Sequence, residues 1–320
     1  MGQTKATSVF SGQAAAAAFA AFNLRDRYYR QMAGLVINAS RARHAWVAPR
    51  VIDVGARVGI TTMEVLSTSN FGHSGRIIAV EAEEEMRRYC AINTMGDPRV
   101  EVVEGNGGNL RKAIGNHFFA DAVLICQGLH LYHPSRENTS VPTVLQQVSM
   151  SLCRSGVVTF DLGPSNYEFD LPLTDHRRGI MSTSGEIMTE LNHPLYQRAQ
   201  AILLDIVLRE IPGFDQKNLW PPLAARMDFD FLTEACKQAG LNELQVSEEL
   251  VPISGQRVVN FIRNGWAVFF RWPPLSDSPT EQKLALMKEA LNRLFKASDF
   301  EAMSTMVSYH PSAVFTAVKA

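Results

Sequence analysis

The stretch Val51-Ile52-Asp53-Val54-Gly55-Ala56-Arg57-Val58-Gly59-Ile60 decides the fold of this chain. Apolar and β-branched residues lead into two glycines, and a helix-forming segment follows. This order predicts a buried strand, a tight turn and the start of a helix. Gly55 permits a turn with positive φ, and Gly59 permits close approach of helix and ligand. Such a turn presents backbone N–H groups and the positive end of a helix to a ligand.

A second predicted strand covers residues 76–81 and ends in Glu81. A carboxylate at the tip of the second strand can accept hydrogen bonds from both hydroxyls of a ribose. The two segments together predict a nucleoside-containing cofactor on a doubly wound sheet. The alternative is an ordinary βαβ unit whose short turn binds nothing.

The spacing of the glycines separates two kinds of cofactor. The dinucleotide fingerprint is G-x-G-x-x-G, whereas this turn has G-x-x-x-G, with Arg57 where a second glycine would let a pyrophosphate approach. The stretch instead resembles motif I of class I S-adenosylmethionine-dependent methyltransferases, with Asp53 at the aspartate and Gly55 and Gly59 at two glycines. Arg57 departs from that motif, which usually has glycine or another small residue there. The resemblance extends over about residues 50–272.

Composition narrows the class of protein. The chain has 320 residues, enough for one large domain or a domain with an insertion. Its formal net charge of −1 argues against a nucleic-acid partner. The four cysteines lie far apart without a C-x-x-C pair, which favours a reducing compartment over a zinc or disulfide framework. No apolar run is long enough to span a bilayer, so we expect a cytoplasmic protein without a membrane partner.

The predicted elements alternate as in an α/β protein. The resemblance implies a doubly wound, mostly parallel seven-stranded sheet of order 3-2-1-4-5-7-6, whose last two strands form an antiparallel edge hairpin. The ambiguous segment 258–264 is either strand or helix, because Asn264-Gly265 suits a hairpin or a helix C-cap. The expected strands are 50–55, 76–81, 100–103, 120–126, 156–161, 244–251 and 266–272, and the expected helices between them are 60–69, one from 83 onward, 141–152 and 229–240.

Further segments surround this core. We expect N-terminal helices at 13–35 and 37–46, and a C-terminal helix at 281–295 that either caps the sheet or mediates a homo-oligomer. Residues 162–227 separate strand 5 from the next helix by far more than a βα loop requires. Their aromatic content and helical stretches predict an α-helical lid over the substrate. The expected domains are therefore an N-terminal helical lid (1–48), a methyltransferase core with this insertion (49–275) and a C-terminal helical extension (276–320).

Cofactor-binding loops gather at the carboxyl ends of parallel strands. The resemblance implies S-adenosyl-L-methionine as the cofactor, held by residues that end or follow strands 1 to 4. By the same resemblance, Asn106 hydrogen-bonds the adenine edge, although the glycines around it also suit simple turn geometry. The expected cofactor-binding residues are Asp53, Gly55, Ala56, Gly59, Glu81, Ala82, Asn106, Gly107 and Gln127.

Three residues are candidates for catalysis. Glu168 lies just beyond strand 5, where the acceptor is expected, and a carboxylate in an apolar pocket has a raised pKa and acts as a base. His130 follows strand 4, and imidazole titrates near neutral pH. Tyr167 directly precedes Glu168 and lies in the same segment beyond strand 5. The alternatives are a surface carboxylate for Glu168 and a structural histidine for His130.

The substrate-binding candidates come from the N-terminal helix and the insertion: Tyr28, Arg177, Arg178 and Trp220. By the resemblance, Tyr28, Tyr29 or Arg30 contacts the methionine carboxylate; the alternative is an amphipathic helix packed on the sheet. Arg177, Arg178 and Arg198, beside aromatic rings in the insertion, suit a diphosphate with an apolar tail, and Mg²⁺ is then expected on that diphosphate. We expect no metal ligands from the chain itself.

These features predict methyl transfer to a small, largely apolar acceptor of secondary metabolism. No Asn-Pro-Pro-Tyr or Asp-Pro-Pro-Tyr follows strand 4, which by the resemblance favours oxygen or carbon over nitrogen as the methylated atom. A narrower hypothesis is C-methylation of an isoprenyl diphosphate such as geranyl diphosphate, with Glu168 as the base. The alternatives are a nucleotide-cofactor oxidoreductase and a non-catalytic S-adenosylmethionine-binding protein.

Overall fold

The computed structural model describes residues 16–17, 20, 24, 27–69, 71–115, 117–129, 132, 140–162, 194–210, 227–264 and 280–320. The contacts within the chain divide it into two compact units. The first unit comprises Ser11–Phe169, Ala224–Glu249 and Pro311–Ala320, and the second comprises Met1–Phe10, Asp170–Leu223 and Leu250–His310.

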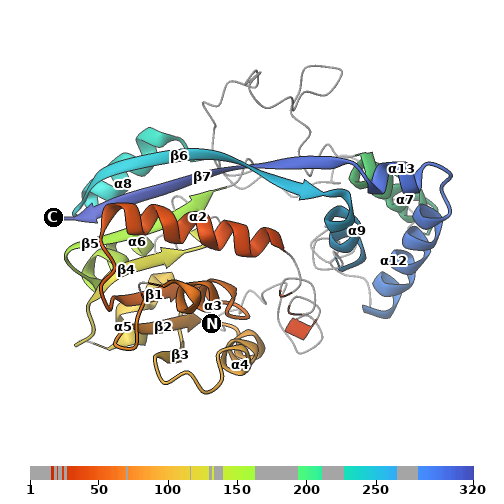
Figure 1. The fold of residues 1–320 in the computed structure, drawn as a ribbon. Helices are drawn as coiled ribbons and strands as arrows, with labels where there is room; N and C mark the ends of the chain where they lie inside the picture. Colours follow the sequence, from red (N-terminus) through yellow and green to blue (C-terminus); the bar gives the residue numbers. More distant parts are fainter. Residues whose placement is uncertain are drawn as a thin grey trace, which may run out of the picture. The chain divides into compact units, whose positions relative to one another are not determined.

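A seven-stranded sheet has the order β3-β2-β1-β4-β5-β7-β6 (Figure 1). Strands β1 to β5 pair in parallel, and β7 runs antiparallel to β5. This is the order that the resemblance to class I methyltransferases implies, and it is the arrangement of that fold. The strands are β1 (Arg50–Val54), β2 (Arg76–Glu81), β3 (Val100–Glu104), β4 (Ala120–Ile125), β5 (Leu152–Leu162), β6 (Leu241–Ser254) and β7 (Val307–Lys319).

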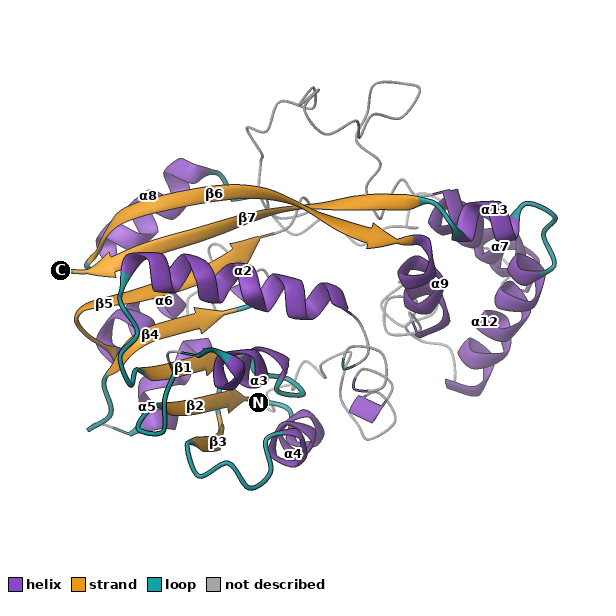
Figure 2. Cartoon of the chain, viewed as in Figure 1, coloured by secondary structure: helices purple, strands orange, loops and turns teal. Residues whose placement is uncertain are grey.

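Helices cover both faces of this sheet (Figure 2), so its central strands are apolar on both faces, as buried parallel strands are. One face carries α2 (Arg27–Arg43), α3 (Ile60–Ser67) and α4 (Glu84–Asn93), and the other carries α5 (Leu110–Ile114), α6 (Val141–Ser151) and α8 (Phe229–Gln238). The alternation of strand and helix places the β-to-α loops at the carboxyl ends of β1, β2 and β4.

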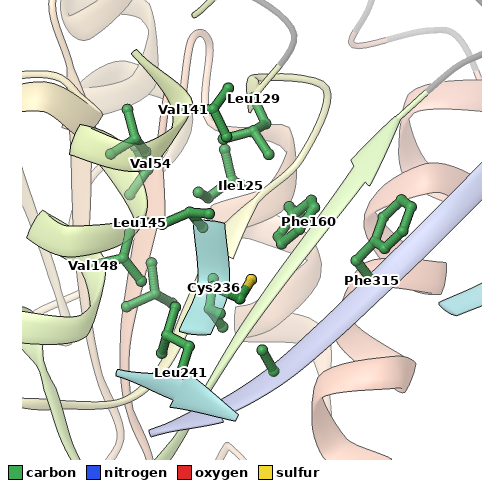
Figure 3. Packing of buried hydrophobic residues seen from close by; sticks show 14 of the residues in the cluster. Val54, Ile125, Leu129, Val141, Leu145, Val148, Phe160, Cys236, Leu241 and Phe315 are labelled. Atoms are coloured by element: carbon green, nitrogen blue, oxygen red, sulfur yellow. The ribbon is translucent and has the colours of Figure 1, made fainter. Parts of the chain in front are cut away.

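The larger core cluster lies between the sheet and α6 and α8 (Figure 3). The Phe160 ring of β5 stacks on the Phe315 ring of β7, with centroids 5.1 Å apart and planes 13° apart. Leu145 and Val148 of α6 and Cys236 of α8 belong to the same cluster and are fully or almost fully buried. The stacked rings therefore join the antiparallel strand β7 to the parallel part of the sheet.

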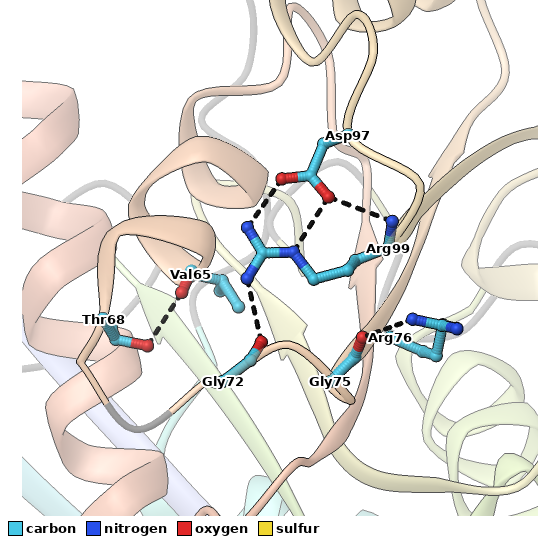
Figure 4. A network of polar contacts seen from close by, with 7 residues as sticks. All are labelled: Val65, Thr68, Gly72, Gly75, Arg76, Asp97 and Arg99. Atoms are coloured by element: carbon cyan, nitrogen blue, oxygen red, sulfur yellow. Dashed lines mark hydrogen bonds and ion pairs between the residues drawn. The ribbon is translucent and has the colours of Figure 1, made fainter.

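Opposite the carboxyl ends of the strands, an arginine ties two loops together (Figure 4). Arg99, just before β3, donates to Asp97 from Nε (2.8 Å) and Nη2 (2.6 Å) and to the Gly72 carbonyl from Nη1 (2.9 Å). Its guanidinium also lies over the Phe71 ring, 5.3 Å from the centroid. The hydrogen bonds from Arg99 lower the pKa of Asp97 to about 2. This network fixes loops at the amino end of the sheet and takes no part in the site described below.

The C-terminal prediction is wrong in one respect. The expected seventh strand, 266–272, lies outside the described residues, and Val307–Lys319 pairs with β5 in the seventh place. The predicted helical extension 276–320 is helical over α12 (Thr280–Phe295) and α13 (Phe300–Ser304) but ends in a strand. Strands β6 and β7 thus form no short hairpin. The run Ala313–Ala317 is apolar except for Thr316, so it gives no period that separates strand from helix.

Two smaller differences concern helices. Residues 27–43 form one continuous helix, α2, where the sequence suggested a break between two helices. An isolated glycine such as Gly34 is tolerated inside a helix, and an added Cβ there would meet nothing within 4 Å. The ambiguous segment near 258–264 is helical, as part of α9 (Gly255–Asn264).

The second unit is helical in its described part apart from the ends of β6 and β7. Helix α7 (Pro194–Glu210), which falls in the predicted insertion, packs on α9, α12 and α13. Arg293 of α12 pairs with Asp205 of α7 at 3.0 Å, and Arg209 pairs with the same carboxylate at 3.2 Å. Among the helices that the structure describes, none is both long and apolar enough to cross a bilayer.

Candidate cofactor-binding site

A pocket opens at the carboxyl ends of β1 and β4. Its volume is about 310 Å³ with the solvent at its mouth included. The order of the sheet reverses between these two strands, and ligands of open α/β sheets bind at that switch point. The lining residues come from α2, from the loop after β1, from the first turn of α3 and from the loop after β4: Tyr29, Gly55, Ala56, Arg57, Val58, Ile60, Thr61, Cys126 and Gln127.

The loop after β1 takes the left-handed conformation at every second residue. The φ angles are 72° at Gly55, 50° at Arg57 and 89° at Gly59. An added Cβ at Gly55 would meet nothing within 4 Å, so this glycine leaves open space beside the pocket. An added Cβ at Gly59 would lie 3.0 Å from Cys90 Sγ. The second glycine therefore lets the loop approach α4, whereas the sequence suggested approach to a ligand.

Asp53 lies in β1 and binds the helix that follows the loop. Its carboxylate is 1% exposed and accepts a 2.6 Å hydrogen bond from Thr62 Oγ1 in the first turn of α3. Burial raises the pKa of Asp53 to about 6; the charge of Glu81 adds to this rise, and the Thr62 hydrogen bonds and the Arg57 charge oppose it. Asp53 thus fixes the start of α3 against the end of β1.

Glu81 ends β2 and faces the same loop. Its Oε2 accepts from the Arg57 backbone N–H (2.8 Å), and its Oε1 accepts from the Glu83 backbone N–H (2.9 Å). A carboxylate offers about four acceptor positions, so each oxygen can still accept one further hydrogen bond. The carbonyl of the neighbouring Ala82 accepts from Arg87 Nη1 at 2.6 Å. The orientation of Glu81 is therefore fixed by the backbone while its carboxylate remains able to bind hydroxyls.

The loop after β3 closes on itself. Asn106 Oδ1 accepts from the backbone N–H groups of Gly108 (2.8 Å) and Asn109 (3.2 Å), and Asn109 Oδ1 accepts from the Asn106 N–H (2.8 Å). The side-chain oxygen of Asn106 thus serves the local turn, which is the alternative weighed above. The predicted contact of Asn106 with adenine stays a prediction, and the side-chain amide nitrogen of Asn106 is the atom left to make it. Gly107 donates its N–H to Tyr132 Oη at 2.8 Å.

A buried cluster holds Gln127 after β4. Asp161, at the end of β5, accepts from the Gln127 backbone N–H (2.6 Å) and from Gln127 Nε2 (2.7 Å). Burial raises the pKa of Asp161 to about 6, and the Gln127 hydrogen bonds and Arg57 oppose that rise. Tyr28 Oη lies 3.4 Å from Gln127 Nε2. Gln127 has a φ of 53°, and its carbonyl accepts a hydrogen bond from Arg57 Nη2.

The structure brings most of the predicted cofactor residues together. Gly55, Ala56 and Gln127 line the pocket, and Asp53, Gly59 and Glu81 contact or belong to the loop that forms its wall. The predicted residues Glu168, Tyr167, His130, Arg177, Arg178 and Trp220 lie outside the described residues, so their roles stay predictions.

On α2, Tyr29 lines the pocket, whereas Tyr28 is buried behind it against Gln127. Arg30 pairs with Glu64 of α3 at 2.9 Å, as an amphipathic packed helix predicts. The sequence analysis missed Asp161. A carboxylate that ends a buried strand is the same signal that identified Glu81, and it was available for β5.

No protein-family model and no curated protein matches this sequence. Solved structures that resemble the chain include the YcgJ protein from Bacillus subtilis (14% identity, 90% of this chain and 98% of that chain, TM-score 0.49). Another is phosphoethanolamine N-methyltransferase 2 from Haemonchus contortus with S-adenosyl-L-methionine (11% identity, 96% of this chain and 57% of that chain, TM-score 0.49). A third is the [4+2]-cyclase SpnF (14% identity, 91% and 81%, TM-score 0.47).

Proposed function

We propose that this chain binds S-adenosyl-L-methionine and transfers its methyl group to a small, largely apolar acceptor. The observation that carries the proposal is the junction of the β1 loop with Glu81. At the switch point of a sheet with an antiparallel β7, a left-handed glycine turn meets a carboxylate held at the end of β2. Glu81 retains acceptor positions for the two hydroxyls of a ribose.

The chemistry of the pocket suits a cation. The Gln127 carbonyl lines the pocket and the buried carboxyls of Asp53 and Asp161 lie close behind its wall, so they can attract positive charge. The ligand proposed here carries a sulfonium and an ammonium group besides its carboxylate. Gly55 leaves open space on the side of the loop where the ligand is expected. When bound, S-adenosyl-L-methionine would supply an activated methyl group. The chain would align that group with the acceptor and exclude water from the site.

The same features argue against a dinucleotide cofactor. A pyrophosphate would bring two negative charges toward Asp53 and Glu81, and the Arg57 side chain stands where the fingerprint requires a glycine. The antiparallel β7 next to β5 also differs from the six-strand order of dinucleotide-binding folds. The oxidoreductase alternative therefore lacks both the loop and the sheet it needs.

The acceptor and the base belong to this proposal as well. We place Glu168, with Tyr167 beside it, as the group that removes a proton from the acceptor, with His130 as the second candidate. Arg177, Arg178 and Trp220 are proposed to bind the acceptor. If the acceptor is an isoprenyl diphosphate, the arginines hold the diphosphate together with Mg²⁺. A secondary-metabolite acceptor methylated at oxygen or carbon is the broader form of the proposal.

Calorimetric titration with S-adenosylhomocysteine tests the site. We expect micromolar binding to the wild type and a loss of roughly 10- to 100-fold in Glu81→Gln, because a carboxylate acceptor of hydroxyl hydrogen bonds becomes a neutral amide. Glu104→Gln is the matched control: Glu104 ends the neighbouring strand β3, but its side chain is 77% exposed. Equal affinity of Glu81→Gln and wild type would remove the proposed ribose contact.

Transfer itself separates an enzyme from a non-catalytic binding protein. The assay uses S-adenosylmethionine with a labelled methyl group and a panel of phenols, alkenes and geranyl diphosphate with Mg²⁺. Glu168→Gln is expected to lower turnover while the affinity for S-adenosylhomocysteine is kept. Cofactor binding without transfer to any acceptor would favour the non-catalytic alternative.

A further inference from the structure

Arg57 occupies a backbone conformation that suits glycine. Its φ of 50° lies between the positive φ angles of Gly55 and Gly59. Left-handed backbone is uncommon for a residue with a Cβ and persists where the surroundings impose it. A glycine would take the same conformation without strain. The reason for an arginine at this position therefore lies in the contacts of its side chain.

The side chain of Arg57 contacts the inner end of the pocket. Its Nη2 donates to the Gln127 carbonyl, while its backbone N–H donates to Glu81 Oε2 at 2.8 Å. The direction of that carbonyl is fixed, because Asp161 binds both the backbone N–H and the side-chain amide of Gln127. Arg57 also lines the pocket itself. Its guanidinium is thus held on a rigid acceptor within the wall.

The charge of Arg57 is directed to carboxylates of the chain. Asp53 and Asp161 are 1% and 0% exposed, and Arg57 lowers the pKa of each against the effect of burial. Glu81 accepts from the Arg57 backbone and adds a third negative charge at this edge of the sheet. An anion placed beside Arg57 would meet this negative surrounding. A cation would be attracted to the same carbonyl and carboxylates that the guanidinium contacts.

We propose that the Arg57 guanidinium holds the position that the ammonium group of a ligand takes on binding, so that such a ligand displaces it from the Gln127 carbonyl. This inference rests on the proposed function and adds a competition between the ligand and a cation of the protein. Displacement costs binding free energy, which lowers the apparent affinity for cationic ligands. The adenosine part of the ligand is not affected. Arg57 is therefore a specificity-determining residue that lowers the affinity for ligands with an ammonium group.

Arg57→Gly tests the competition, because glycine keeps the left-handed backbone. Two ligands are compared by calorimetry: S-adenosylhomocysteine, whose amino-acid end has an ammonium and a carboxylate group, and 5′-methylthioadenosine, which has the same adenosine without either group. We expect the variant to bind S-adenosylhomocysteine at least about fivefold tighter and 5′-methylthioadenosine within about twofold of wild type. Weaker binding of S-adenosylhomocysteine alone would mean that Arg57 contacts the ligand directly and would overturn the inference. An equal change for both ligands would trace the effect to the loop backbone and would also overturn it.

A second measurement uses the unaltered chain. The arginine side-chain NMR signal of Arg57 is assigned by its absence in Arg57→Lys. It should move on addition of S-adenosylhomocysteine and stay in place with 5′-methylthioadenosine. A signal that both ligands leave unchanged contradicts displacement. If 5′-methylthioadenosine binds, the adenosine site exists and only the inference is at stake. If neither ligand binds wild type or variants, the proposed function fails and this inference fails with it.

Discussion

The carboxyl of Asp161 offers a quantitative test of the buried cluster. Burial raises its pKa to about 6, against an ordinary value of 3.8. Because the folded chain then holds a proton at pH values where the unfolded chain has lost it, the free energy of unfolding falls as the pH rises from about 4 to about 6. The size of the fall is about 3 kcal/mol, at about 1.4 kcal/mol for each pKa unit.

Asp161→Asn removes this titration while its side-chain oxygen still accepts from the Gln127 N–H. Urea unfolding followed by circular dichroism at pH 4.5 and pH 7.5 gives the change in free energy for each protein. We expect the loss of stability between the two pH values to be smaller in Asp161→Asn than in wild type, by up to about 3 kcal/mol.

Asp121→Asn provides a control of opposite sign. Burial raises the pKa of Asp121, but the hydrogen bonds from Arg50 prevail and hold it below the ordinary value. Its carboxylate therefore stabilises the fold above the unfolded pKa, and its removal costs stability at neutral pH. An identical pH dependence of wild type and Asp161→Asn would show that Asp161 ionises normally and would refute the account of this cluster.

Three further substitutions test the packing and the loop. Phe315→Ala should lower the free energy of unfolding by about 3–5 kcal/mol, because it removes a buried ring stacked on β5, and a loss below about 1 kcal/mol would contradict that packing. Thr62→Val should cost about 1–3 kcal/mol by leaving Asp53 without its 2.6 Å partner, whereas Thr62→Ser should restore most of the stability; equal losses in both would exclude the hydrogen bond as the cause. Gly59→Ala should weaken S-adenosylhomocysteine binding and lower the free energy of unfolding, because the added Cβ would lie 3.0 Å from Cys90 Sγ. Adding Cys90→Ala to the same chain should recover part of both losses, and no recovery would contradict this contact as their cause.

The sequence predicted the part of the site that depends on local chemistry. Gly55 was predicted to take a positive φ, and Glu81 was placed at the end of a buried strand; the structure has both. The order of the strands followed from the resemblance and is the observed order. The glycine turn and the strand that ends in Glu81 are each encoded by a few neighbouring residues, so a single sequence suffices to find them.

The features that sequence analysis missed depend on contacts between distant residues. Its place at the end of a buried strand makes Asp161 a candidate, but nothing near it indicates that it binds Gln127, 34 positions earlier. Strand β7 was missed because a short apolar run has no distinctive period, and only its pairing with β5 defines it. Arg57 was recognised as a departure from the motif, but its role depends on a carbonyl that lies 70 residues later.

The most direct test of the central claim is a comparison of two cofactors on the wild-type chain. Calorimetric titrations with S-adenosylhomocysteine and with NADH, under the same conditions, ask which nucleoside ligand the β1 loop and Glu81 accept. The account predicts micromolar binding of S-adenosylhomocysteine and no measurable heat from NADH. Binding of NADH, or of neither ligand, would contradict the assignment of this loop to S-adenosylmethionine.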